Sequence, residues 1–289
     1  MELGCADPAN PCKLHNAMAG DPPLKQVVTS TLEAGLRGNF SASTGSVTWN
    51  LGVFRADNQD DILFVADNAA GYGYFKNFGK TRRQGVEAGF STQLAGLTVG
   101  ANYTWLDATF RSAETLGGAG NSSNGEAQAG LPGVDGNIGI QPGHRMPLVP
   151  RHQFKLFAEL PLGAQFSIGA DVTAMSSSYA RGNENNAHQA DGTYYLGSGQ
   201  SAGYAVLNLN ADWKPTPAVT VFVQVNNLLD HAYSSAAQLG ATAFDANGHF
   251  VARPLPAHGN GDRPLVSSTF YAPGAPRSVY LGLRYAFGR

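Results

Sequence analysis

The chain has 289 residues, of which only 14% are charged, and a formal net charge of −2 at pH 7. This balance offers no excess of cations for a nucleic-acid partner. The sequence contains no apolar run near the roughly 18 residues that a membrane-spanning helix needs, and no long amphipathic helical pattern. Glycine is abundant, at 36 residues. We therefore predict an all-β fold.

The first 24 residues form a segment with Pro, Asn and Gly that contains both cysteines, Cys5 and Cys12. No further cysteine completes a four-ligand metal site. Two interpretations stay open: a small loop closed by a Cys5–Cys12 disulfide in an oxidising compartment, or two reduced thiols. The segment has no basic start and no apolar h-region, so we expect no secretory signal in it.

Alternating apolar and polar residues predict about nine strands along the rest of the chain. The predicted bounds, in chain order, are 25–39, 46–66, 73–94, 97–111, 151–160, 164–178, 203–213, 218–235 and 277–287. In VTVFVQVN (219–226), for example, valine occupies every second position. The alternate positions of these strands carry Asn, Thr, Ser, Gly and Gln, whereas a soluble sheet surface would carry many Lys and Glu. This pattern favours lipid on the apolar face and a water-filled lumen on the polar face.

Aromatic residues recur toward the strand ends, where a membrane protein places its interfacial girdles. They include Trp105, Trp213, Tyr285 and Phe287.

The connections between the predicted strands alternate in length. Short ones lie at 39–45, 94–96, 161–163 and 214–217, and long ones at about 112–150, 181–202 and 234–276. We expect the long connections to lack regular structure, and a transmembrane barrel with short turns on one side and long loops on the other accommodates them. With an odd number of strands, the first and last run in the same direction and cannot close an antiparallel barrel. We therefore expect part of a larger barrel.

Four motifs stand out: NFGKTRRQGVEAGF (77–90), MPLVPRHQFKL (146–156), NNLLDHAY (226–233) and FYAPGAPRSVYLGLRYAF (270–287). Together they resemble the C-terminal barrel of TonB-dependent outer-membrane receptors. The resemblance implies an extracellular loop over residues 1–24, then a barrel segment over residues 25–289 with about nine of the 22 strands of such barrels. It also implies that the plug domain of the family is absent from this chain.

The function implied by the resemblance is uptake of a scarce nutrient, most often a ferric siderophore, across the outer membrane of a Gram-negative bacterium. The partners implied are TonB, acting through the missing plug, a ferric siderophore or similar chelate, the lipid bilayer and the barrel assembly machinery. We expect no cofactor. No catalytic motif is present, so we predict no enzyme.

Several charged residues are candidates for a site. Lys80, Arg82, Arg83 and Glu87 could line the lumen, where the resemblance implies that Arg83 and Glu87 pair with the plug; a wall ion pair or hydrated charges are the alternative. Gly85 would let the backbone pass a bulky group.

Three carboxylates lie close together in RADNQDDILF, a spacing that can bind Ca²⁺. They are Asp57, Asp60 and Asp61. The glycine and terminal glutamate of an EF-hand loop are missing, and we favour a solvated rim over a metal site.

The seven histidines have no pair at metal-ligand spacing, and we see no haem-receptor motif. They are His15, His144, His152, His188, His231, His249 and His258. The last three lie in or near the last long loop and could contact a ligand or simply be solvated.

Ligand contacts are expected from aromatic, polar and cationic residues of the outer loops. The candidates are Tyr179, Arg181, Asn183, Glu184, Asn185, Tyr194 and Tyr195. Loops of this composition can also be disordered.

Two motifs have a structural interpretation. Asn227 and Asp230 in NNLLD can bond backbone groups at the end of a strand and turn the chain. Phe287 is the aromatic that the barrel assembly machinery would recognise; Gly288 and Arg289 follow it, which either weakens recognition or extends the chain into the periplasm.

Two other classes of protein stay open. A self-contained small barrel, such as an autotransporter translocator or a porin-like protein, would need an even number of strands. A soluble secreted β-sandwich binding module would need a water-soluble surface on its sheets.

Overall fold

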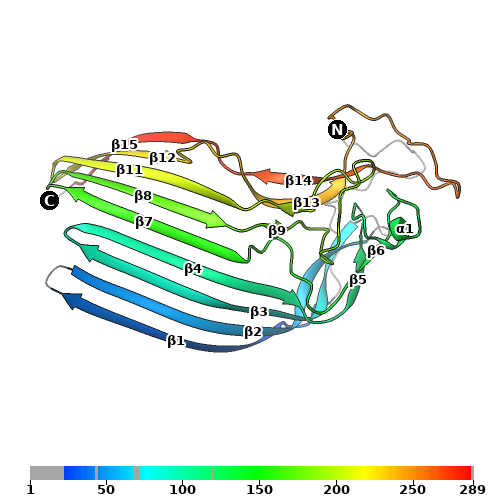
Figure 1. Cartoon of the computed structure of the whole chain (residues 1–289), viewed down its shortest axis with the longest axis horizontal. Helices are drawn as coiled ribbons and strands as arrows, with labels where there is room; N and C mark the ends of the chain where they lie inside the picture. Colours follow the sequence, from blue (N-terminus) through cyan, green and yellow to red (C-terminus); the bar gives the residue numbers. More distant parts are fainter. Residues whose placement is uncertain (1–22, 43–44, 68–71, 119, 288–289) are drawn as a thin grey trace.

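The computed structural model describes residues 23–42, 45–67, 72–118 and 120–287, and its main element is one nine-stranded antiparallel sheet (Figure 1). In sheet order its strands are β1 (Val28–Ala42), β2 (Gly45–Asp67), β3 (Tyr72–Leu94), β4 (Leu97–Phe110), β7 (His152–Leu162), β8 (Phe166–Met175), β11 (Tyr204–Thr216), β12 (Val219–Asn226) and β15 (Ser278–Tyr285). All nine predicted strands are confirmed, although the eighth ends at Asn226 and not at residue 235. The strands form one sheet and not two packed sheets, so the β-sandwich alternative is wrong.

The register places the predicted apolar positions of all the strands on one face. Leu51 of β2 pairs with Leu36 of β1, and Leu209 of β11 pairs with Val225 of β12. Large apolar side chains on this face are exposed: Leu36, Leu51, Val53, Phe90, Ile168, Val223 and Leu281. Because so much apolar surface faces outward without a protein partner, this face suits lipid better than water. We call it the outer face.

The opposite face is polar and lies under the long loops. Thr81 of β3 pairs with Phe110 of β4 on this face. Phe110 is fully buried against Leu116 and Ile138 of the following loop. The loop therefore folds over the polar face, which we call the inner face.

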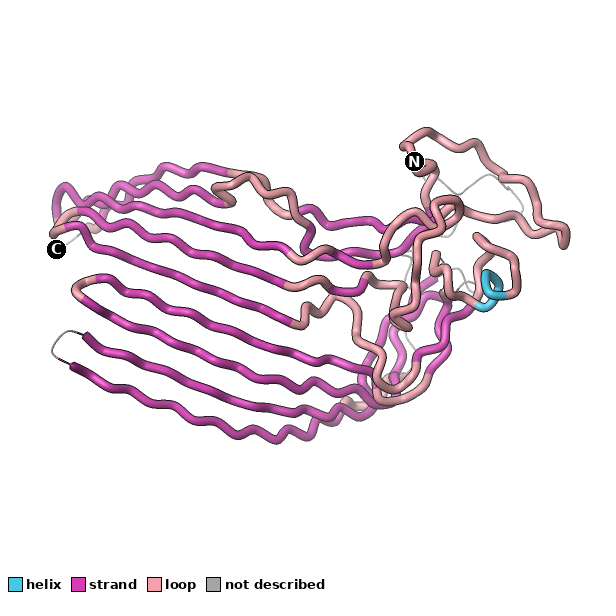
Figure 2. The backbone as a smooth tube through the Cα atoms, viewed as in Figure 1, coloured by secondary structure: helices cyan, strands magenta, loops and turns pink. Residues whose placement is uncertain are grey.

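The two ends of the sheet differ, as the connection lengths predict (Figure 2). At one end β3 and β4 join through Ala95 and Gly96, both with a positive φ, which is the two-residue turn that matches strand twist. At the other end, β4, β8 and β12 lead into the long loops, which gather together at one end of the sheet.

The long loops carry regular structure of their own, and the prediction that they lack it is wrong. They contain three small hairpins and one helical turn: β5 (Glu114–Gly117) with β6 (Asn137–Ile140), β9 (Ser178–Tyr179) with β10 (Gln200–Ser201), β13 (Ser234–Ala241) with β14 (Ser267–Pro273), and α1 (Gly125–Gln128). These pairs join residues far apart in sequence, so local patterns did not reveal them.

The sheet is open within the described residues: β1 and β15 stand at its two edges and do not pair with each other. Both run from the loop end to the turn end, so they are parallel, as the odd strand number predicts. Among the described residues, no helix combines the length and apolar character needed to cross a bilayer.

The NNLLD motif ends β12 as predicted. Asn227 is buried with a left-handed φ of 49°. Its Oδ1 accepts the His231 N–H at 2.9 Å, and its Nδ2 donates to the His231 and Ala275 carbonyls. Asp230 Oδ1 accepts the Arg277 N–H at 3.0 Å. The two side chains thus join the end of β12 to the start of β15.

Candidate functional site

The inner face forms a polar wall whose side chains come from neighbouring strands. Asn208 of β11 donates to Asp171 of β8 at 2.8 Å. Lys155 pairs in register with Asn102, and Glu87 with Thr104. Because both signs of charge and several amides line this wall, it can accept a hydrated or polar solute.

Three phenylalanines of the inner wall each lie over a glycine directly opposite in the neighbouring strand. The pairs are Phe54 with Gly85, Phe157 with Gly100, and Phe222 with Gly282. A β-carbon at Gly85 would lie 2.9 Å from the Phe54 ring. The bulky group that Gly85 accommodates is therefore an aromatic ring of the wall itself.

The three long loops form one cap, held together by hydrogen bonds between them. Asn121 Nδ2 of the first loop donates to the Gly182 carbonyl of the second at 2.8 Å. Gly199 N–H of the second loop donates to Thr269 Oγ1 of the third at 2.9 Å. His258 of the third loop contacts the Pro132 carbonyl of the first at 2.9 Å. Each loop thus contacts the other two, and the cap acts as one unit.

His188 is a buried junction of this cap. Its Nδ1 accepts the Ser122 N–H at 3.1 Å, so Nε2 carries the proton and donates to the Gly197 carbonyl at 3.0 Å. Burial lowers the pKa of His188, against the effects of the Gly197 carbonyl and the Asp191 carboxylate. The neutral imidazole is therefore the form that joins the loops.

Three of the predicted ligand contacts are buried members of the cap, and their role as ligand contacts stays a prediction. Asn183, Asn185 and Tyr195 are buried. Asn183 Nδ2 donates to the Gly199 carbonyl, Asn185 Nδ2 to Ser123 Oγ, and the Tyr195 hydroxyl accepts the Gly133 N–H at 2.9 Å. Burial raises the pKa of Tyr195.

The other four predicted contacts lie in different surroundings. Tyr179 stacks under the Arg145 guanidinium, at 5.4 Å from its ring centroid. Glu184 is half-buried and accepts the Gly182 N–H at 2.9 Å; burial raises its pKa. Tyr194 lies beside the His258 ring, and Arg181 is exposed next to the β13–β14 hairpin. The structure does not bring the seven candidates together into one surface.

The four charged residues predicted for the lumen divide between the two faces, so their common placement is wrong. Arg83 and Glu87 pair with Ala56 and Gly52 on the inner face. Lys80 and Arg82 lie on the outer face, because the two-residue period of a strand sends odd and even positions to opposite sides.

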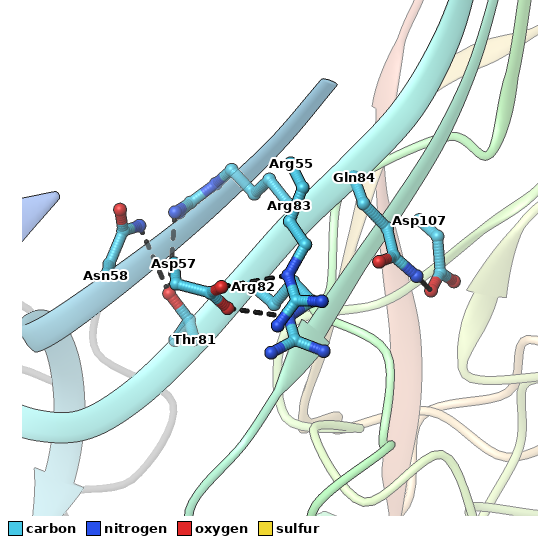
Figure 3. Close-up of polar contacts among 8 residues, drawn as sticks. All are labelled: Arg55, Asp57, Asn58, Thr81, Arg82, Arg83, Gln84 and Asp107. Carbon is cyan, nitrogen blue, oxygen red and sulfur yellow. Dashed lines mark hydrogen bonds and ion pairs between the residues drawn. The ribbon is translucent and has the colours of Figure 1, made fainter. Parts of the chain in front are cut away.

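The three aspartates do not converge on a metal site. Asp57 pairs with Arg55 at 2.9 Å and with Arg82 at 2.6 Å, and Figure 3 shows both guanidinium groups directed at its carboxylate. Asp61 contacts Arg83 at 3.4 Å and Thr81 at 2.5 Å. Within the described part of the chain, no group of His, Cys, Asp and Glu side chains is placed to hold a metal ion.

The remaining predicted residues are dispersed. His249 is exposed and contacts Asp245 at 3.4 Å, and His231 borders a cavity of about 580 Å³ between the β9–β10 and β13–β14 hairpins. Phe287 is 87% exposed and packs edge-on against Tyr285. Cys5 and Cys12, the predicted disulfide, lie outside the described residues.

Three residues that the sequence did not single out make contacts that join separate segments: Asn121, Arg145 and Arg151. Arg151 donates to Asp107 at 2.8 Å on the outer face, and Asp107 also accepts from Gln84 at 3.4 Å (Figure 3 shows the latter pair). The run NSSN (121–124) was a detectable signal, because Asn and Ser bond local backbone at turns.

Comparison with known proteins agrees with this architecture. The family model described as TonB dependent receptor-like, beta-barrel matches residues 13–228. The ferric-catecholate import receptor Fiu from E. coli K12 is similar, with 18% identity over 93% of this chain and 30% of that chain and a TM-score of 0.54. The siderophore receptor PiuA from Acinetobacter baumannii has 17% identity over 89% of this chain and 28% of that chain, with a TM-score of 0.55.

The copper transporter OprC is also similar, with 18% identity over 91% of this chain and 32% of that chain and a TM-score of 0.54. At these identities the structures show a shared fold. The chain spans 28–32% of the length of these three structures.

Proposed function

Because the chain belongs to the TonB-dependent receptor family through its β-barrel, we propose that it forms the C-terminal part of an outer-membrane receptor that imports a scarce nutrient. The observation that carries this proposal is the division of the sheet into an apolar outer face and a polar inner face beneath a structured cap of loops. Such a sheet is stable only when lipid covers its apolar face and further strands of a barrel pair with its two edges. The family consists of transport receptors and not of enzymes.

A ferric siderophore is the ligand that we propose first. Fiu is described as a ferric-catecholate import receptor and PiuA as a siderophore receptor. OprC is described as a copper transporter, which makes copper the second candidate. The inner wall supports either, since its amides and charges suit a polar chelate and its phenylalanines offer flat contact surfaces.

The partners follow from the same proposal. The edge strands β1 and β15 would pair with strands of the remainder of the barrel. Each edge strand has backbone N–H and C=O groups that such a partner strand would bond. Arg83 and Glu87 on the inner face would contact the plug, which TonB engages from the periplasm. Phe287, exposed beside the edge strand β15, would be read by the barrel assembly machinery.

The transport proposal is tested by growth under iron limitation. The strain that encodes this chain is compared with its deletion mutant on a panel of ferric catecholate, hydroxamate and carboxylate siderophores, with and without functional TonB. We expect growth on at least one siderophore to require both the gene and TonB. If the deletion leaves growth unchanged on every siderophore but impairs it under copper limitation, the proposed ligand becomes copper. If the deletion has no effect under either limitation, the import proposal is wrong.

The size of the receptor is tested on outer-membrane fractions with an antibody against residues 234–276. We expect a heat-modifiable band well above the 30.3 kDa of this chain. A heat-modifiable band at that mass would instead support the self-contained small barrel.

A further inference from the structure

The outer face carries a cluster of cations directly beyond its loop-side aromatic residues. Tyr103 and Trp105 of β4 and His152 of β7 lie at this level, and the Tyr103 hydroxyl bonds His152 at 2.7 Å. The next rows of the register toward the loops hold charged side chains. We call five of them the cationic patch: Arg55, Lys80, Arg82, Arg145 and Arg151.

The members of the cationic patch come from adjacent strands and one loop. Arg55 of β2 and Arg82 of β3 share Asp57. Arg151 is fixed by Asp107 of β4. Arg145 forms a single antiparallel β-bridge with Thr109 of β4, and Thr109 pairs with Arg82 of β3. The side chains therefore follow the rim of the sheet over three neighbouring strands.

Positive charge exceeds negative charge in this cluster. Two carboxylates, Asp57 and Asp107, stand against five cations. Lys80 is exposed, and its ammonium group forms no ion pair within the described residues. Burial and the nearby Arg151 guanidinium lower the pKa of Arg145, whereas Tyr179 and Asp107 act in the opposite direction. Such a grouping is unfavourable unless an anion neutralises it.

Arg151 has one donor without an acceptor beside its ion pair with Asp107. Its Nη2 donates to Asp107, but its buried Nε has no hydrogen-bond partner. A buried donor left unpaired costs free energy, and native structures seldom leave one without a reason.

The position of the cationic patch identifies the anion. It lies on the same face as the apolar band, so a solute in the lumen cannot reach it. Its height, just beyond the aromatic residues, is that of the lipid headgroups. Guanidinium groups bind phosphate oxygens in paired hydrogen bonds, which makes arginine the preferred partner of phosphate.

We propose that the cationic patch binds the phosphate groups of the phosphorylated lipid that surrounds the receptor in the outer leaflet. This inference rests on the proposed function for the orientation of the sheet in the membrane. Asp57 and Asp107 hold the arginines in place, and Lys80 adds a mobile ammonium group.

The test uses the full receptor, purified in a neutral detergent, with diphosphorylated lipid A as the probe. Its affinity is measured for the wild type, for the double variant Arg82→Gln/Arg145→Gln, and for Arg83→Gln. Arg83 is the matched control, because it follows Arg82 in the chain but lies on the inner face. We expect the double variant to bind about tenfold more weakly, equal to about 1.4 kcal/mol, and the control to bind like the wild type.

Fully dephosphorylated lipid A should bind the wild type as weakly as the double variant does. Equal affinity of all three proteins for the diphosphorylated lipid would overturn the inference. If inorganic phosphate alone binds the cationic patch as tightly as the lipid does, the assignment to lipid is wrong. If the double variant loses its heat-modifiable mobility and is therefore not folded, Lys80→Gln replaces it, since Lys80 is exposed; we then expect a smaller but measurable loss, and no loss would overturn the inference.

Ferric-siderophore uptake by the same variants separates this inference from the proposed function. We expect uptake by Arg82→Gln/Arg145→Gln to remain at the wild-type level, because the cationic patch faces away from the lumen. Patch-dependent lipid binding without uptake by any protein would overturn the proposed function alone, and uptake without patch-dependent binding would overturn the lipid inference alone.

Discussion

Arg82 and Arg83 are consecutive residues of β3, yet they form ion pairs on opposite faces of the sheet. Arg82 Nε lies 2.6 Å from Asp57 Oδ1 on the outer face, and Arg83 Nη1 lies 3.4 Å from Asp61 Oδ2 on the inner face. In a regular strand Asp57 and Asp61 would share a face. They do not, because Asp60 between them has a left-handed φ of 54°, which reverses the alternation.

Asp60 should therefore be sensitive to residues that avoid this conformation. We expect Asp60→Val to lower the free energy of unfolding by about 1–2 kcal/mol, since the left-handed region is strained for a β-branched residue. Asp60→Gly, in the same position, should be neutral or stabilising because glycine adopts a positive φ freely. Urea unfolding of the full receptor in lipid vesicles measures both; equal stability of the two variants would contradict the role of φ.

Gly85 should not tolerate a side chain. A β-carbon there would overlap the Trp105 carbonyl oxygen and would lie 2.9 Å from the Phe54 ring. Because the backbone cannot yield easily, we expect Gly85→Ala to destabilise the receptor by about 1–3 kcal/mol. The matched control is Gly52→Ala on the same inner face, where the nearest atom is 4.0 Å away. A loss of stability in the control equal to that of Gly85→Ala would refute the explanation by steric overlap.

Asn227 should be required for the junction between β12 and β15. Its amide makes three hydrogen bonds from a buried position, and Asn227→Ala removes all of them. We expect a loss of about 1–3 kcal/mol, measured as a lower urea midpoint, because backbone groups are left unpaired. Asn137→Ala, at an exposed position of β6, is the control and should change stability little. Indistinguishable midpoints for the two variants would show that the junction does not depend on this amide.

Val223 and Gln224 test which face of β12 meets lipid. They are neighbours in the strand, with Val223 on the outer face beside Leu281 and Gln224 on the inner face beside Tyr280. Lysine in place of Val223 should cost about 2–4 kcal/mol, because a charge near the bilayer midplane is poorly solvated. Gln224→Lys should cost much less, because the inner face is polar. Urea unfolding in vesicles of both variants decides the matter, and the reverse order of stabilities would invert our assignment of the faces.

The loop cap should loosen in mild acid because of His188. Burial lowers its folded pKa below the ordinary value of 6.5. As the pH falls, the unfolded or opened cap therefore takes up a proton before the folded cap does. The contribution of His188 to the stability of the cap is complete above pH 6.5 and is lost as the pH falls through that value toward the lower folded pKa. Protonation at Nδ1 also breaks the bond from the Ser122 N–H.

Amide hydrogen exchange at Ser122, corrected for the intrinsic pH dependence of exchange, measures this effect. We expect its protection to fall as the pH drops from 7 through 6.5. His188→Gln cannot titrate and should show a flat profile over the same interval. Burial raises the pKa of Glu184, so ionisation of this carboxyl group destabilises the cap as the pH rises. Glu184 therefore cannot cause a loss of cap stability in acid. A wild-type profile as flat as that of His188→Gln would exclude the histidine as the cause.

The strands and their two faces were predictable from the sequence, because a period of two residues is a local property. The run VTVFVQVN shows valine on one side in the sequence, and the register places Val221 beside Leu283 and Val223 beside Leu281 on the outer face. The turn chemistry of Asn227 and Asp230 is local in the same sense, since each bonds groups that the end of the strand releases.

The cap and the charge clusters depended on contacts that only the tertiary structure brings together. Asn121 bonds Asn185 across 64 residues, and Tyr195 bonds Gly133 across 62. Polar residues in a loop have no period that distinguishes a buried hydrogen-bonding role from an exposed one, which is why Asn185 and Tyr195 were predicted as ligand contacts. The face of Asp61 was likewise decided by one left-handed residue, Asp60, because its positive φ reverses the alternation of sides between Asp57 and Asp61.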